Sequence, residues 1–271
     1  MVFGLIRSAI HHHNQLMDTY GDPRVKDWLL MGSPLPTIFL SLAYVFIVKY
    51  LGPKLMENRK PFQLRKAIIV YNACMVAFSS WIVYEGVTWG WAAGVSFRCE
   101  PCDFSNSPRA LRVASCAWWY FFSKLVEFID TFFFVLRKKN NQISTLHVTH
   151  HAIMPIGVWF GASLYPGGQA VFFGILNSFV HVIMYSYYLL AALGPEFKKY
   201  LWWKKYLTII QLVQFVLIFF HTMQLFFIDC AVPILFGYLI SGYAALFIAL
   251  FSRFYKEAYV VGETKAQTMM R

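Results

Sequence analysis

The sequence predicts an all-α membrane protein with seven transmembrane helices, and three observations support this fold class. Of the 271 residues, 58% are hydrophobic and only 14% are charged, whereas soluble domains carry about 25% charged residues. Apolar runs recur along the chain, and each approaches the roughly 20 residues that a helix needs to cross a bilayer. The loops between these runs alternate in their content of Lys and Arg. We therefore expect the chain to cross a membrane repeatedly.

Seven apolar runs are expected to form helices, namely residues 31–50, 67–85, 110–136, 147–165, 169–193, 206–228 and 232–252. They define a seven-helix transmembrane domain, residues 31–252. A polar segment, residues 1–30, precedes this domain, and a tail, residues 253–271, follows it. The leading segment contains His11, His12 and His13, which form a poor metal-ligand set because adjacent residues splay around a helix.

The formal charge of +11 is distributed asymmetrically, and this indicates membrane orientation rather than binding to nucleic acid. With seven spans, 17 of the 24 Lys and Arg residues fall on one side and six on the other, while Lys124 lies within a span. Short loops rich in Lys and Arg remain in the cytosol. We expect a lumenal N-terminus and a cytosolic C-terminus.

Three cysteines fall in loops on the lumenal side, where disulfide bonds can form. Cys99 and Cys102 follow the second span, and Cys230 lies between the last two. We favour a bond between Cys99 and Cys230. A Cys102–Cys230 bond, a local Cys99–Cys102 bond and free thiols stay open, because spacing does not decide connectivity.

The fourth span opens with three histidines, His147, His150 and His151, whose spacing places the rings on one helix face. Asp, Lys or Arg at the centre of a membrane helix costs about 2.5 to 3.5 kcal/mol, so ionisable residues at this depth usually serve a function. We interpret the three histidines as part of a functional site.

Three neighbouring spans carry further polar groups: Lys124, Glu127, Asp130 and Thr131 in the third, Asn177, His181, Met184, Tyr185 and Tyr188 in the fifth, and Thr208, Gln211 and Gln214 in the sixth. The set in the third span has a purely structural alternative as a self-neutralising patch, and that in the fifth span as a satisfied interior pair. Counted at about 1.5 Å per residue from the basic loops, most lie roughly 9 to 20 Å deep. Helices three to six would then surround a chamber with one polar layer and apolar walls that suit a hydrocarbon tail.

The motifs Lys124-x-x-Glu-x-x-Asp-Thr131, His147-x-x-His-His151, Asn177-x-x-x-His181-x-x-Met-Tyr-x-Tyr-Tyr188 and Thr208-x-x-Gln-x-x-Gln214 occur in this order. Together they resemble the signature set of the very-long-chain fatty acid elongase (ELO) family. The resemblance implies six helices in a ring around a narrow acyl tunnel, with the first helix peripheral. It also implies a multi-pass protein of the endoplasmic reticulum that condenses long-chain acyl-CoA with malonyl-CoA to 3-oxoacyl-CoA, releasing CO2 and CoA.

Such a protein would contact membrane lipid and act beside the reductases and the dehydratase of the elongation cycle. No nucleic acid, metal or cofactor is expected. Homo-oligomerisation stays open.

Condensation needs a nucleophile that accepts the acyl group, and no Cys lies among these motifs. We therefore expect an acyl-imidazole on His150, with His151 and His147 handling protons and His181 near the reacting carbon. The residues expected to hold the substrates or these rings are Lys124, Glu127, Asp130, Asn177, Tyr188, Gln211, Gln214, Lys204, Lys205 and Arg137. The basic rim would bind CoA phosphates, although positive loops also arise from topology alone.

Two other classes of protein share some of these features. A di-iron lipid desaturase or hydroxylase also uses His-x-x-His-His, but it needs more histidine ligands than the five that lie within the spans. A seven-helix transporter or receptor needs an aqueous path or an open mouth, and the loops after the fourth and sixth spans are short.

Overall fold

The computed structural model describes residue 15 and residues 17–261, and every regular element in this part of the chain is helical. The main helices are α2 (Pro34–Phe46), α4 (Arg65–Trp89), α5 (Pro108–Val126), α6 (Phe128–Leu136), α7 (Thr145–Leu164), α8 (Ala170–Leu193), α9 (Lys204–Met223) and α10 (Ile234–Tyr255). A π-helical turn, Ile47–Leu51, continues α2 into α3 (Gly52–Met56), and another, Lys256–Val261, extends α10. The all-helical prediction is confirmed for the described residues. His11–His13 and the tail from residue 262 lie outside them.

Each of the seven predicted ranges overlaps a helix, and the range 110–136 overlaps two, α5 and α6. Three of these helices begin at a serine that caps the first turn. The hydroxyls of Ser33, Ser107 and Ser144 each accept a backbone N–H of that turn, which otherwise has no partner within the helix. Pro34 and Pro108 follow two of the caps, where a missing N–H costs nothing.

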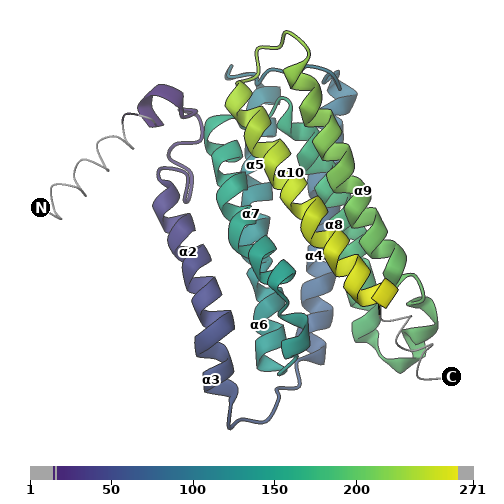
Figure 1. Cartoon of the computed structure of the whole chain (residues 1–271). Helices are drawn as coiled ribbons and strands as arrows, with labels where there is room; N and C mark the ends of the chain where they lie inside the picture. Colours follow the sequence, from purple (N-terminus) through teal and green to yellow (C-terminus); the bar gives the residue numbers. More distant parts are fainter. Residues whose placement is uncertain (1–14, 16, 262–271) are drawn as a thin grey trace, which may run out of the picture.

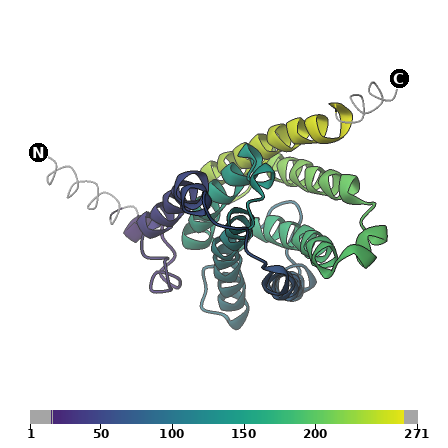
Figure 2. The ribbon, with the colours of Figure 1, turned by 90° about the horizontal axis from the view of Figure 1, so that it is seen from below.

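The helices run side by side along one common direction (Figure 1). α4 packs most extensively against α8, and α9 packs against α10. α2 lies at the edge of the bundle in the end view (Figure 2), where its main contact is with α7. The helices that carry the polar motifs therefore lie on the inner side of α2, within the bundle.

Five helical segments are long and apolar enough to cross a membrane, namely Pro34–Met56, Arg65–Ala93, Ala170–Leu193, Lys204–Phe226 and Ile234–Val260. Their outer faces expose large apolar side chains such as Phe39 and Phe220, which suit a lipid environment. The chain is a multi-pass membrane protein. α5 and α7 are not among the five; α5 carries two arginines and Lys124, and α7 carries the three histidines.

The two ends of the bundle differ in chemistry. We call the end that carries Arg65, Arg137 and Lys204 the basic end. At the opposite end, a disulfide bond joins Cys99 to Cys230 and so ties the α4–α5 loop to the α9–α10 loop; we call this the disulfide end. Cys102 is a buried free thiol. Burial raises its pKa to about 12, so it stays protonated and is a poor nucleophile for disulfide exchange.

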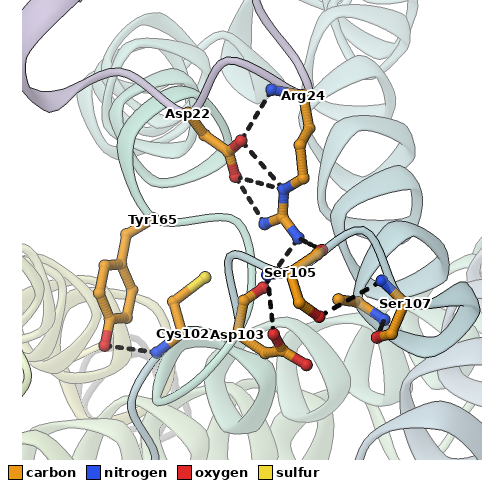
Figure 3. Close-up of polar contacts among 8 residues, drawn as sticks. Asp22, Arg24, Cys102, Asp103, Ser105, Ser107 and Tyr165 are labelled. Atoms are coloured by element: carbon orange, nitrogen blue, oxygen red, sulfur yellow. Dashed lines mark hydrogen bonds and ion pairs between the residues drawn. The ribbon is translucent and has the colours of Figure 1, made fainter.

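A buried ion pair ties the segment before α2 to this disulfide end (Figure 3). The guanidinium of Arg24 donates to both carboxylate oxygens of Asp22 at 2.6 to 3.0 Å. Its Nη1 also donates to the carbonyls of Asp103 (2.8 Å) and Ser105 (2.6 Å) in the loop before α5. The Asp22 N–H donates to the carbonyl of Ser163 near the end of α7. The Asp22–Arg24 pair thus connects three parts of the chain.

We expect Arg24→Ala to lower the free energy of unfolding by about 3 to 5 kcal/mol, because the carboxylate of Asp22 would stay buried without its partner. Thermal unfolding of the detergent-solubilised protein should show a Tm lower by at least about 6 °C. Lys26→Ala is the matched control, since the Lys26–Asp18 pair is largely exposed. Equal shifts for the two variants would contradict the buried-pair explanation.

Candidate functional site

A buried ion pair at the junction of α5 and α6 forms the centre of the site. Lys124 Nζ donates to Glu127 Oε1 at 2.7 Å and to Asn177 Oδ1 at 3.0 Å. The same ammonium lies over the Tyr120 ring, 4.6 Å from its centroid. Glu127 separates α5 from α6. The Lys124 and Glu127 side chains are 2% and 1% exposed, so each depends on the other for charge compensation.

Glu127 also orients a histidine from another helix. Its Oε1 lies 3.2 Å from Nδ1 of His181 on α8. A carboxylate can only accept, so Nδ1 carries the proton in this contact and Nε2 of the neutral ring is left as an acceptor. One carboxylate therefore holds a lysine and sets the tautomer of His181.

The three histidines of α7 form a row of neighbouring rings. His147 and His151 have ring centroids 4.3 Å apart, and His151 and His150 are 5.2 Å apart. His147 Nε2 is hydrogen-bonded to Thr131 Oγ1 at 2.8 Å. The centroid of the His150 ring lies 4.9 Å from that of the Phe247 ring in α10. Among the described residues, no group of three His, Cys, Asp or Glu side chains is arranged to hold a metal ion.

Amide side chains extend this polar layer to α9. Asn177 Oδ1 accepts the Tyr120 hydroxyl at 2.8 Å, and Asn177 Nδ2 donates to Gln214 Oε1 at 3.5 Å. Gln211 faces a different neighbour, since its Nε2 contacts Met184 Sδ at 3.4 Å. Asn177 and Gln214 thus share a network with Lys124, whereas Gln211 lies beside it.

Asp130 points away from the Lys124–Glu127 pair. It accepts the Tyr185 hydroxyl at 2.8 Å and lines a cavity of about 400 Å³ at the basic end, between α4, α6 and α8. Arg65, Arg137 and Tyr188 line the same cavity, which we call the vestibule. Arg65 is held there because its guanidinium donates to the last carbonyls of α8.

Lys204 and Lys205, at the start of α9, are not among the residues that line the vestibule. The ammonium of Lys205 lies 5.8 Å from the Tyr255 ring centroid. Of the basic residues that we expected to meet a phosphate, the structure places Arg137 in the vestibule and adds Arg65, which sequence reasoning treated only as a positive loop residue.

An apolar chamber lies on the other side of the histidines. It consists of two adjoining cavities of about 100 and 130 Å³ that share part of the α7 wall, including Gly157 and Gly161. The chamber extends from Phe247, which touches the His150 ring, to Tyr165 near the disulfide end. The Tyr165 hydroxyl accepts the Cys102 N–H at 2.7 Å, which fixes this far wall.

The walls of the chamber differ from our expectation that helices three to six would enclose it. α4 and α10 also contribute, and α9 contributes only to the cavity nearer His150. The expected single layer is likewise divided in two, because Asp130 and Tyr188 face the vestibule. Helical spacing predicts a face of one helix, but it does not tell which neighbour that face meets.

These features define a class of membrane protein in which a buried imidazole cluster separates a polar vestibule from an apolar chamber. Comparison with known proteins gives the family: the model of the ELO (GNS1/SUR4) family matches residues 29–267, and the chain belongs to this family.

Named relatives agree with this assignment. The chain is 58% identical over 257 residues to "Very long chain fatty acid elongase 7" of Drosophila melanogaster, covering 94% of this chain and 78% of that protein. It is 52% identical over 267 residues to the protein of the same name from Rattus norvegicus, covering 97% and 94%. It is 47% identical over 261 residues to "Very long chain fatty acid elongase 1" of Homo sapiens, covering 95% and 93%.

We expect Lys124→Met to destabilise the protein by about 3 to 5 kcal/mol, because it leaves the Glu127 carboxylate buried without a cation. The double variant Lys124→Met/Glu127→Gln should recover most of this loss, since it removes both charges. Thermal unfolding of the two variants and the wild type measures the effect. A double variant less stable than Lys124→Met would contradict mutual charge compensation.

Proposed function

We propose that this chain is the condensing enzyme of very-long-chain fatty acid elongation, a 3-oxoacyl-CoA synthase. It would join a long-chain acyl-CoA to malonyl-CoA and release CO2 and CoA. The observation that carries the proposal is the position of His150, whose ring borders both the histidine cluster and Phe247, a wall residue of the apolar chamber. The family and the names of the relatives support the same activity.

In the membrane, α5–α6 and α7 would cross with the five apolar segments, which makes seven spans. Six of them would surround the acyl tunnel, with α2 outside. The basic end would face the cytosol and the disulfide end the lumen of the endoplasmic reticulum, with the N-terminus lumenal and the C-terminus cytosolic. The reductases and the dehydratase of the cycle would then receive the product at the cytosolic face.

The acyl tail would lie in the chamber with its thioester at His150. Each methylene group moved from water into an apolar site contributes about 0.8 kcal/mol, so a long tail binds strongly and places the carbonyl beside the imidazole. Tyr165 and the loop around Cys102 would limit how far the tail extends.

His150 is the best-placed nucleophile because, of the three α7 histidines, it is the one whose ring contacts Phe247 in the chamber wall. His147 Nε2 is bonded to Thr131, and His181 Nδ1 is bonded to Glu127. The His150 imidazole would attack the thioester carbonyl, the C–S bond would break, and the proton lost by the imidazole would pass to the CoA sulfur. The product of this half-reaction is an acyl-imidazole.

In the second half-reaction, loss of CO2 from malonyl-CoA leaves an enolate whose carbon attacks the acyl-imidazole and releases His150. Asn177 and Gln214 are candidate amide donors to the developing oxyanion, with Gln211 nearby. The overall reaction consumes one proton, which must enter from water. Asp130 and Tyr185 lie between the vestibule and His181, whose ring is 5.7 Å from that of Tyr185. In this scheme, no metal or cofactor takes part.

The CoA groups would bind in the vestibule. Arg65 and Arg137 bring two guanidinium groups to its wall, and guanidinium is suited to bidentate contact with phosphate. Tyr188 lines the same cavity and would contact the part of CoA nearest the thioester. Lys204 and Lys205 would act from outside, by attraction over a longer range.

We expect acyl-CoA alone to release CoA and to leave an acyl group on the protein before malonyl-CoA is added. Intact-protein mass spectrometry should detect this mass, and added malonyl-CoA should convert it to 3-oxoacyl-CoA. His150→Ala should abolish the adduct. His221→Ala should keep it, because His221 stacks on Phe172 at 3.9 Å, away from the cluster.

The outcomes separate the mechanism from the function. Product formation at full rate without any adduct would show that the covalent step is wrong, while the condensing activity would stand. Failure to form 3-oxoacyl-CoA from any member of a panel of acyl-CoAs would show that the proposed activity itself is wrong.

We expect Arg137→Glu to raise the KM for both CoA substrates by about 10-fold or more, because a charged hydrogen bond contributes about 1.5 to 3 kcal/mol. The kcat should change little, since Arg137 lies outside the histidine cluster. Lys204→Glu is the control of equal charge change outside the vestibule and should have a smaller effect. Steady-state kinetics at two salt concentrations measures both variants. An equal effect of the two would indicate a general surface field instead of a phosphate site.

A further inference from the structure

The peripheral helix α2 reaches the site through a tyrosine. Tyr44 is 1% exposed although α2 lies at the edge of the bundle. Its ring stacks on Phe128 of α6, with centroids 4.3 Å apart and an interplanar angle of 15°. The same ring lies 6.3 Å from that of His151. This burial places a hydroxyl of α2 at the level of the histidines.

A chain of two hydrogen bonds leads from this hydroxyl to the first histidine of the cluster. Tyr44 Oη and Thr131 Oγ1 are 2.8 Å apart, and Thr131 Oγ1 and His147 Nε2 are also 2.8 Å apart. Tyr44 and Thr131 are 1% and 0% exposed, so water does not compete for these bonds. Three elements, α2, α6 and α7, each contribute one group.

The number of hydrogens decides the direction of the chain. Each hydroxyl has one hydrogen to donate, and among the described residues Thr131 is the hydrogen-bond partner of the Tyr44 hydroxyl. If Tyr44 donates to Thr131, then Thr131 donates to His147 and both buried hydroxyls are satisfied; the remaining donor is the Nδ1–H of His147, a residue that is only partly buried. In the reverse direction, His147 Nε2–H would donate to Thr131 and Thr131 to Tyr44, which leaves the Tyr44 hydrogen buried without an acceptor.

We propose that Tyr44 is a positioning residue, which acts through Thr131 to keep His147 in the tautomer with the proton on Nδ1. This inference rests on the proposed imidazole chemistry. The His147 ring neighbours His151, and His151 neighbours His150. When the proton of His147 is fixed on Nδ1, fewer proton arrangements remain for His151 and His150. His147 is thereby kept out of direct attack on the thioester, and His150 remains the ring that accepts the acyl group.

The test compares variants that remove the hydroxyl with one that disturbs only the packing of α2. Tyr44→Phe keeps the ring that stacks on Phe128 and removes the donor. We expect kcat to fall about 10-fold, within the range typical of groups that orient a site residue, with an unchanged KM for acyl-CoA and a shifted pH–rate profile. Val48→Ala shortens a buried side chain one turn after Tyr44, in the π-helical turn that continues α2, and should change stability but neither kcat nor the profile.

Thr131 supplies the second pair of variants. Thr131→Ser keeps the hydroxyl and should behave as wild type, whereas Thr131→Val should lower kcat. Tyr44→Phe added to Thr131→Val should have little further effect, because both changes interrupt one chain. Additive losses in the double variant would overturn the proposal, and so would equal losses of kcat in Val48→Ala and Tyr44→Phe.

A readout independent of activity separates this inference from the proposed function. Nitrogen NMR of histidine-labelled protein in lipid bilayers reports which ring nitrogen carries the proton, and His147→Gln identifies the signal of His147. We expect a single Nδ1–H form in the wild type and a mixture in Tyr44→Phe. An unchanged His147 signal in Tyr44→Phe would overturn the proposal even if the enzyme condenses its substrates. A changed signal in a protein without condensing activity would leave the positioning role standing and refute the function.

Discussion

The buried pair of Lys124 and Glu127 is the interaction on which the rest of the site depends. Removing either charge from water is costly, and the cost is offset only if each remaining lone pair or proton has a partner. Those partners are Asn177, the face of the Tyr120 ring and His181. They come from α5 and α8, so the pair requires these helices at close distance and also orients the groups that we assign to chemistry.

The site lies where two environments meet along α7. Its first turns carry the histidines, and its later turns carry Gly157 and Gly161, which line both cavities of the chamber. A substrate whose reactive thioester joins a polar head to an apolar tail matches this order, from the polar histidines to the apolar chamber. His150 stands at the boundary and touches Phe247. In the proposed reaction, the same helix would bind the tail and present the nucleophile.

The two ends of the bundle are closed to different degrees. At the disulfide end, the Cys99–Cys230 bond, the Asp22–Arg24 pair and the hydrogen bond of Tyr165 hold the loops over the chamber. At the basic end, the vestibule has a volume of about 400 Å³, compared with about 170 Å³ for the cavity among the loops of the disulfide end. This asymmetry agrees with a charged group that enters at one end and a tail that ends blindly near the other.

The sequence by itself determined the helices and the polar face of each one, because the helical spacing of apolar residues and the serine caps are set by neighbouring residues in the chain. It also determined that the histidines belong together, since their spacing places them on one face. Only the tertiary structure decided that Asp130 turns to the vestibule, that Arg65 joins Arg137 there, and that Tyr44 reaches His147. The physical reason is the same in each case: helical period sets a direction around one axis, but the partner on that side depends on how all the helices pack.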